Sequence, residues 1–352
     1  MIIRHTLIKI SNLLLKKKRV MQLIHQVNNI ANLPSYYPEK SRKDYKTRKK
    51  EIISWLKKHG ELNHFYTLYG LDIEGSDSSG FIDYFSFMES RNRINQIDKF
   101  NSQIVLLRDK FLFFKYMRSN HLPVPEIFAV SREGTLYNAD FAQITWECMR
   151  EEYDYFVKDI NGECASFVKH VNDYQELLNL KNCLSKGTYI FQRKVLQCQE
   201  MNTINSNALN TLRIVTINKN GAPYVLTSLL RVGTSKTGKV DNWAAGGLAV
   251  GINKSGYLKE FGFFKPTYGL KVSEHPDSKI VFSTFLVPMY NEALELACKA
   301  HRCFYGIGAI GWDVAITENG PVFIEGNDNW EISLQQACDR PLKYDWQEAI
   351  KN

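Results

Sequence analysis

The sequence lacks several patterns that assign a chain to a common class of protein. Its seven cysteines are scattered without a CxxC motif or paired spacing, which predicts reduced thiols, no zinc site and a cytoplasmic location. No long apolar run is free of charges, so no transmembrane helix is predicted. There is no basic groove with interleaved aromatic residues, which argues against nucleic acid as a partner. No credible Ser/His/Asp or Cys/His set for covalent catalysis is present either.

The chain has the composition of an ordinary globular protein. Its 352 residues are enough for two or three domains with cores of their own. The net charge of +8 fits binding of an anionic ligand, such as a nucleotide or an acidic sugar, without demanding one.

The N-terminal stretch 1–26 alternates basic and apolar residues. Charges interrupt every apolar run and no small-residue cleavage site follows, so it does not have the features of a signal peptide. We favour a helix packed on the main body. The alternative is a basic amphipathic helix that makes a peripheral contact with the anionic inner face of a membrane.

The strongest local pattern is a hairpin over residues 310–327. Residues 310–316 alternate between apolar and small or acidic side chains, and turn residues follow. Pairing that is symmetric about Asn319 places Asp313 opposite Glu325, with Asn327 on the same face as Glu325. Facing carboxylates repel each other, and a cation between them removes that cost. The oxygen donors of Asp313, Glu325 and Asn327 suit Mg²⁺.

Two other interpretations accompany this hairpin. It can be a surface ribbon with two solvated acids, although its apolar residues make that less favourable. If the two carboxylates do repel each other in the metal-free protein, Asp313→Asn relieves the repulsion and leaves the melting temperature high.

A lysine and a glycine-containing loop form the second candidate site. Lys158 ends a strand predicted over 153–158, and the polar loop 159–166 with Gly162 follows. A cation together with backbone N–H groups is a common way to hold phosphate. By itself the pattern is weak, because many ordinary hairpins contain Lys and Gly.

Two arginines lie at the outer ends of a second predicted hairpin, over 210–217 and 223–231. A turn centred near residues 221 and 222 brings Arg213 and Arg231 close to facing each other, and an anion between them fits guanidinium chemistry. They can equally be solvent-facing residues at strand ends. In the segment 241–251, Gly246 and Gly247 allow close approach of a ligand to the backbone or form a plain turn.

Together and in this order, the segments resemble the ATP-grasp superfamily, most closely its sugar-transfer-associated branch connected with cell-surface polysaccharide synthesis. The resemblance covers about residues 105–340. It is carried by Asp109-Lys110, Leu122-Pro123-Val124-Pro125, Phe156-Val157-Lys158 with Asn161-Gly162, Tyr189-Ile190-Phe191-Gln192, Asn210-Thr211-Leu212-Arg213-Ile214-Val215-Thr216, Asp241-Asn242 with Gly246-Gly247, Gly311-Trp312-Asp313-Val314-Ala315 and Ile324-Glu325-Gly326-Asn327.

The resemblance implies an α+β protein with an ATP-grasp fold, in which two subdomains sandwich ATP. The nucleotide and lid subdomain is expected over 105–196 and the metal and catalytic subdomain over 197–340. A mostly helical region over 1–104 precedes them, in place of the α/β domain that is common in the superfamily, and a polar tail over 341–352 follows.

The resemblance also implies a role for each matching residue. Lys110 and Lys158 would contact the phosphates of ATP, and the loop with Gly162 would close over them. The strand beside adenine would be formed by Gln192, Arg193, Lys194 and Val195. Arg213 and Arg231 would bind the γ-phosphate and the acyl phosphate, and two Mg²⁺ ions would be held by Asp313, Glu325 and Asn327. The substrates are assigned to Asn242, Gly246 and Gly247, and Asn329 is added because it lies just beyond the hairpin, at the expected edge of the acceptor site.

The implied activity is that of an ATP-dependent carboxylate–amine ligase. A sugar acid or amino acid used in capsular polysaccharide biosynthesis is the expected carboxylate, activated as an acyl phosphate. Two alternatives stay open: a kinase on the same scaffold, and an accessory protein of glycan assembly that binds nucleotide without turnover. The intact Asp/Glu/Asn set argues against the accessory protein.

Overall fold

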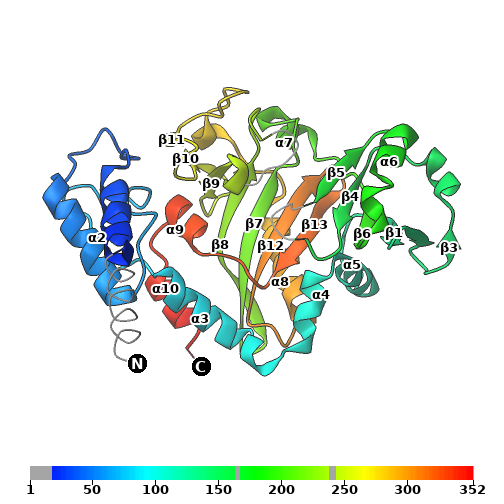
Figure 1. Cartoon of the computed structure of the whole chain (residues 1–352), viewed down its shortest axis with the longest axis horizontal. Helices are drawn as coiled ribbons and strands as arrows, with labels where there is room; N and C mark the ends of the chain where they lie inside the picture. Colours follow the sequence, from blue (N-terminus) through cyan, green and yellow to red (C-terminus); the bar gives the residue numbers. More distant parts are fainter. Residues whose placement is uncertain (1–17, 163–166, 238–242, 352) are drawn as a thin grey trace, which may run out of the picture. The chain divides into compact units, whose positions relative to one another are not determined.

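A computed structural model describes residues 18–162, 167–237 and 243–351. The chain divides into two compact units, residues 1–87 and residues 88–352 (Figure 1). Among the described residues, no helix combines the length and the apolar character needed to cross a bilayer.

The first unit is built on two helices. One spans residues 18–32, and the second, α2 (Tyr45–His59), begins at Asp44, whose carboxylate accepts hydrogen bonds from two backbone N–H groups. It ends at Gly60, whose φ of 76° allows the left-handed conformation that closes a helix. Both helices contribute to one apolar core, made of Val27, Ile30, Ala31, Ile52, Trp55, Tyr66, Leu71 and Phe81.

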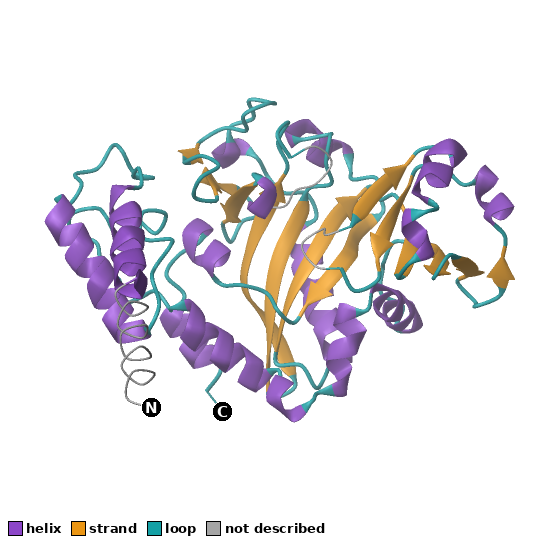
Figure 2. Cartoon of the chain, viewed as in Figure 1, coloured by secondary structure: helices purple, strands orange, loops and turns teal. Residues whose placement is uncertain are grey.

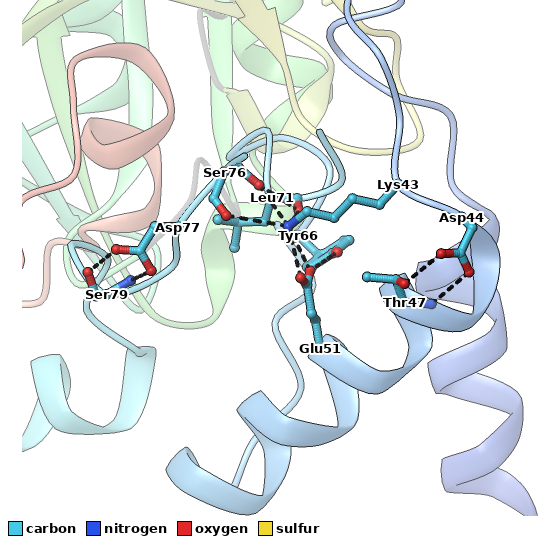
Figure 3. Close-up of polar contacts among 9 residues, drawn as sticks. All are labelled: Lys43, Asp44, Thr47, Glu51, Tyr66, Leu71, Ser76, Asp77 and Ser79. Atoms are coloured by element: carbon cyan, nitrogen blue, oxygen red, sulfur yellow. Dashed lines mark hydrogen bonds and ion pairs between the residues drawn. The ribbon is translucent and has the colours of Figure 1, made fainter. Parts of the chain in front are cut away.

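A buried lysine connects the loops of this unit to α2 (Figure 3). The Nζ of Lys43 lies 2.9 Å from Glu51 Oε1 and donates to the carbonyl of Leu71 at 2.9 Å and to Ser76 Oγ at 3.0 Å. Tyr66 donates its hydroxyl to the other Glu51 oxygen at 2.5 Å. Because Lys43 is only 7% exposed, these partners compensate for the cost of burying its charge.

The second unit contains two antiparallel sheets (Figure 2). The six-stranded sheet has the order β3-β2-β1-β6-β4-β5, and the seven-stranded sheet has the order β11-β10-β9-β8-β7-β12-β13. The strands of the first sheet are β1 (Ile127–Arg132), β2 (Thr135–Asn138), β3 (Gln143–Ile144), β4 (Tyr155–Asp159), β5 (Val168–Val171) and β6 (Thr188–Arg193). Those of the second are β7 (Thr211–Lys219), β8 (Ala222–Val232), β9 (Leu248–Ile252), β10 (Leu258–Phe264), β11 (Lys271–Val272), β12 (Ala309–Thr317) and β13 (Gly320–Asn327).

Helices cover these sheets. The main ones are α4 (Val105–Arg108), α5 (Lys110–Ser119), α6 (Tyr174–Leu180), α7 (Gln199–Ile204), α8 (Tyr290–Cys303), α9 (Ser333–Cys338) and α10 (Lys343–Ala349). Helix α3 (Tyr84–Ile94) includes the residue at which the second unit begins. Helix α8 packs its alanines Ala293, Ala297 and Ala300 into the core of the seven-stranded sheet. Helix α5 packs Phe111 and Phe114 against strands β1 and β6.

The β12–β13 hairpin has the predicted pairing of its acidic residues. Asp313 lies opposite Glu325 and Gly311 lies opposite Asn327. Contrary to the prediction, the hairpin is not symmetric about Asn319. Thr317 pairs with Gly320, so the turn is shorter, and the hairpin has a bulge between Asp313 and Val314. The bulge restores the register that the shorter turn would shift by one residue.

The C-terminal segment differs from the predicted polar tail. Residues 343–349 form α10, which buries Trp346 and Ala349. The Trp346 ring lies 5.7 Å from that of Trp330, and its Nε1 donates to Ser90 Oγ at 2.9 Å. The tail folds because its large aromatic side chain and one small residue, three positions apart, form a helical face.

Candidate active site

A single large cavity in the second unit brings together most of the predicted site residues. Its volume is about 1130 Å³, and both sheets contribute to its wall. We call it the central cavity. The predicted residues that line it are Lys110, Lys158, Gly162, Gln192, Arg193, Lys194, Val195, Arg213, Arg231, Asp313, Glu325, Asn327 and Asn329.

Asp313 lies between the two predicted arginines. Arg213 contacts its carboxylate through Nε at 2.5 Å and Nη2 at 3.1 Å, and Arg231 Nη1 lies 3.1 Å from Oδ2. Asp313 is 1% exposed, so in this structure the anion shared by the two guanidiniums is a side chain of the protein.

The two arginines do not face each other directly, which corrects the predicted register. Arg213 pairs with Leu229, and Arg231 pairs with Thr211. Two features set this register. Asn220 and Gly221 have φ values of 53° and 82°, which make a tight two-residue turn, and a bulge between Val215 and Thr216 then moves the pairing by one residue. The two arginines still share one face of the sheet, because Arg213 and Thr211 are two residues apart on one strand.

The two facing carboxyl groups have opposite pKa shifts. Burial by itself would raise the pKa of Asp313, but the guanidiniums of Arg213 and Arg231 outweigh burial and hold it well below its usual range. The pKa of Glu325 is raised, first by burial and then by the negative charge of Asp313. Asp313 therefore carries the negative charge of the pair, and Glu325 holds a proton more readily.

The same residues fit a divalent cation. The raised pKa of Glu325 shows that a second negative charge is unfavourable here without added positive charge. Asn327, which donates to Glu325 Oε1 at 3.3 Å, adds an amide to the two carboxylates. The described residues contain no group of three or more His, Cys, Asp or Glu side chains placed to hold a metal, so this mixed Asp/Glu/Asn set is the candidate.

The two predicted lysines enter the cavity from separate elements. Lys110 is the first residue of α5, which Asp109 caps by accepting from two backbone N–H groups. Its Nζ donates to the carbonyl of Gly162 at 2.6 Å. Lys158, on β4, donates to Gln192 Oε1 on neighbouring β6 at 2.6 Å. Residues 163–166 of the predicted closing loop lie outside the described residues.

The predicted adenine strand is only partly available to a ligand. The backbone N–H of Arg193 donates to the carbonyl of Glu126 at 2.8 Å. Its guanidinium contacts Glu152 and lies over the ring of Phe128. Lys194 and Val195 follow the end of β6 and line the central cavity.

The predicted substrate residues are spread more widely. Asn329 lines the cavity, whereas Gly246 and Gly247 are not among the described residues that line it. Gly246 has a φ of 98°, so the turn itself accounts for its glycine. Asn242 lies outside the described residues, and its neighbour Trp243 contributes to the wall.

Two arginines that hold residues of the cavity wall, Arg108 and Arg91, were not predicted from the sequence. Arg108 forms a bidentate pair with Asp328, with Nε–Oδ1 at 3.0 Å and Nη2–Oδ2 at 2.7 Å. Arg91 donates to Asn329 Oδ1 at 2.7 Å and to the carbonyl of Trp330. These contacts fix the segment after β13. More than 200 residues separate the partners in sequence, so the available signal was only the position of Arg108 just before Asp109-Lys110.

Comparison with known families gives one match that covers most of the second unit. The family described as sugar-transfer associated ATP-grasp matches residues 91–350. No curated protein matches the chain.

Several solved structures have a related chain path at low sequence identity. N5-carboxyaminoimidazole synthase from Aspergillus clavatus, in complex with ADP and 5-aminoimidazole ribonucleotide, is 13% identical with a TM-score of 0.40, covering 66% of this chain and 47% of that chain. L-amino acid ligase from Bacillus licheniformis is 14% identical with a TM-score of 0.35, covering 64% of this chain and 41% of that chain. D-alanine–D-alanine ligase from Bacillus anthracis is 13% identical with a TM-score of 0.38, covering 69% of this chain and 62% of that chain. The match thus spans less than half of the first two structures and under two thirds of the third.

Proposed function

The chain belongs to the sugar-transfer-associated ATP-grasp family, and from this premise we propose that it is an ATP-dependent ligase that joins a carboxylate to an amine. One observation carries the proposal. The central cavity brings together, from elements of both sheets, cations suited to a polyphosphate and oxygen donors suited to a divalent cation.

Each end of the cavity receives a part of ATP in this proposal. Lys110 and Lys158 hold the phosphates, and the backbone of Lys194 and Val195 faces adenine. Both lysines already donate to oxygen acceptors of the protein, at 2.6 Å, so phosphate oxygens replace Gly162 O and Gln192 Oε1 as their acceptors.

The metal end of the cavity contains Asp313, Glu325 and Asn327, which hold the Mg²⁺ ions that accompany ATP, two in number in this proposal. Bound Mg²⁺ supplies charge neutralisation for the transferring phosphoryl group. Asp313 is also paired with Arg213 and Arg231. When Asp313 serves as a metal ligand, the two guanidiniums are left to bind the γ-phosphate.

The proposed reaction proceeds in two steps. An oxygen of the substrate carboxylate attacks the γ-phosphorus of ATP, the bond to the bridging oxygen breaks, and ADP leaves. An amine then attacks the acyl carbon, phosphate leaves, and an amide forms. Arg213 and Arg231 stabilise the negative charge of both phosphoryl-bearing states. No nucleophile of the protein takes part.

The substrate is proposed to be a sugar acid or an amino-acid substituent used in capsular or other cell-surface polysaccharide. The sugar-transfer association of the family supports this class. Asn329, held by Arg91, lines the cavity and is the residue we place beside the acceptor.

Hydroxylamine trapping tests the ligase. Purified protein with Mg·ATP, a panel of uronic acids and amino acids, and hydroxylamine as the amine should release ADP and form a hydroxamate from the activated carboxylate. Glu325→Gln should abolish both products. The matched control Glu295→Gln, on the exposed surface of α8, should not.

Two outcomes contradict the ligase. ADP release with a stable phosphorylated product and no hydroxamate identifies a kinase. No ADP with any member of the panel, together with intact nucleotide binding, identifies an accessory protein.

A further inference from the structure

The positive charge of the protein is concentrated at its N-terminal end. Residues 1–58 contain 15 lysines and arginines but only 3 aspartates and glutamates, a net charge of +12. The whole chain has 45 basic and 37 acidic residues, so residues 59–352 have 30 and 34, a net charge of −4. The modest total of +8 therefore combines a strongly basic end with a weakly acidic remainder.

One face of α2 presents part of this charge around a hollow. The hollow has a volume of about 560 Å³, and its described lining residues are Tyr45, Lys46, Lys49, Lys50, Ile53, Ser54 and Lys57. Tyr45, Lys49, Ile53 and Lys57 recur every four residues, which places them along one side of the helix. Tyr45 and Ile53 are 40% and 36% exposed, so this face combines cations with accessible apolar surface.

The helix over residues 18–32 has an apolar stripe that continues past the core. Val27 and Ile30 are buried, 3% and 4% exposed. One and two turns earlier on the same stripe, Val20, Leu23 and Ile24 are 49%, 36% and 46% exposed. The stripe is longer than the core of the unit that it packs into.

A hydrogen bond places the two exposed faces on the same side. Tyr45 donates its hydroxyl to Asn28 Oδ1 at 3.1 Å, at an exposed position. Met21 and Ile24 precede Asn28 by seven and four residues, so they lie on the side of their helix that meets Tyr45. Met21 is 59% exposed.

We propose that this side of the N-terminal unit binds a membrane surface that contains anionic lipids. The lysines of α2 contact lipid headgroups, and the apolar side chains of the neighbouring helix enter the headgroup and acyl boundary. A nucleic acid would match the lysines but would leave Met21, Ile24 and Ile53 in water. An anionic bilayer surface accommodates both the lysines and the apolar side chains, so we favour a membrane over a nucleic acid. The proposal is independent of the ligase activity.

Vesicle sedimentation of the full-length protein tests whether the lysines of α2 bind anionic lipids. The protein should sediment with vesicles of equimolar phosphatidylcholine and phosphatidylglycerol and should not sediment with phosphatidylcholine alone. Its binding to the anionic vesicles should weaken, without being lost, as the salt concentration rises. Lys49→Glu combined with Lys50→Glu should weaken binding at least about tenfold, because each lysine near an anionic leaflet strengthens binding about fivefold. The control pair Lys186→Glu and Lys254→Glu, both exposed in the second unit, makes the same change of charge and should leave binding unaltered.

A second pair of substitutions tests the apolar contact. Met21→Gln combined with Ile24→Gln should weaken vesicle binding at high salt as well as at low salt, because it removes apolar contact and no charge. Equal binding to both kinds of vesicle, or an equal loss with the control pair, overturns the proposal. Binding of single-stranded RNA that Lys49→Glu with Lys50→Glu abolishes, without vesicle binding, overturns it in favour of nucleic acid. Thermal melting confirms that each variant is folded.

Discussion

Replacing Asp313 or Glu325 should change stability in opposite directions, although the two residues face each other in one hairpin. Asp313→Asn removes the buried anion that Arg213 and Arg231 share and leaves two cations, with side chains 13% and 16% exposed, without it. Glu325→Gln removes a carboxyl group whose pKa is raised by burial and by Asp313. The first change breaks a favourable arrangement, and the second relieves an unfavourable one.

The magnitude follows from the burial of Asp313. Removing one partner of a buried ion pair costs about 3–5 kcal/mol. The arginines keep some access to water, so we expect about 3 kcal/mol for Asp313→Asn. A domain of this size loses about 2–4 °C of melting temperature per kcal/mol, which gives a fall of roughly 10 °C. Glu325→Gln should leave the melting temperature unchanged or raise it slightly.

The pH dependence has the matching signs. The folded pKa of Asp313 lies below the unfolded value of 3.8, so Asp313 contributes stability above that pH and the contribution is lost as pH falls through the folded pKa. The folded pKa of Glu325 lies above 4.5, so its ionisation reduces stability as pH rises through the folded pKa. Glu325→Gln should therefore gain most stability, relative to the wild type, at pH values above the folded pKa of Glu325.

The assay is thermal melting at neutral pH in the presence of EDTA, followed by ADP formation with Mg·ATP. Both variants should lose ADP formation, because both remove a ligand of the proposed metal site. If Asp313→Asn melts at or above the wild-type temperature, the carboxylate repulsion expected from sequence is the dominant effect and the ion-pair reasoning is wrong. A melting temperature of Glu325→Gln that falls as far as that of Asp313→Asn contradicts the same reasoning.

Three further substitutions test the surroundings of the site. Lys158→Ala removes the amine that donates to Gln192 and that is proposed to bind phosphate. In steady-state kinetics kcat/KM for ATP should fall by roughly 10- to 100-fold, as expected for the loss of a charge-assisted hydrogen bond. The melting temperature should not change. Burial lowers the pKa of His301 to about 4, so the unfolded chain binds a proton that the folded protein excludes between pH 4 and 6.5. The free energy of unfolding should therefore rise by about 3 kcal/mol across that interval, and chemical denaturation should find this rise missing in His301→Asn. Gly311→Ala places a Cβ 2.7 Å from Trp330 Cβ and should cost about 1–3 kcal/mol in the same assay; an unchanged midpoint would show that the segment after β13 yields freely.

The sequence alone predicted several local elements of the second unit, among them the hairpin over residues 310–327. Alternation along residues 310–316 and the turn residues after them predicted the hairpin, because side-chain direction in a strand has period two. The predicted pairing of Asp313 with Glu325 is present, but it depends on a bulge that the pattern did not indicate. The order of the motifs was sufficient for the ATP-grasp family, which the match over residues 91–350 confirms.

Tertiary structure decided what each charged group faces. Asp313 was predicted to repel Glu325, but β7 and β8 bring Arg213 and Arg231 to it across the sheet. The Asn220-Gly221 turn and the bulge between Val215 and Thr216 together set which residues lie opposite the arginines. Period-two patterning determines neither the length of a turn nor the position of a bulge.

Contacts between distant segments were equally beyond the sequence. The ion pair between Arg108 and Asp328 joins residues that are 220 positions apart. Helix α10 is stabilised by the burial of Trp346 beside Trp330. Local propensity and pattern act over a few residues, whereas ion pairs and burial depend on which surfaces the folded chain brings together. The sequence therefore predicted the hairpin and the pairing of its two carboxyl groups, whereas the fold determined which positive charges surround them.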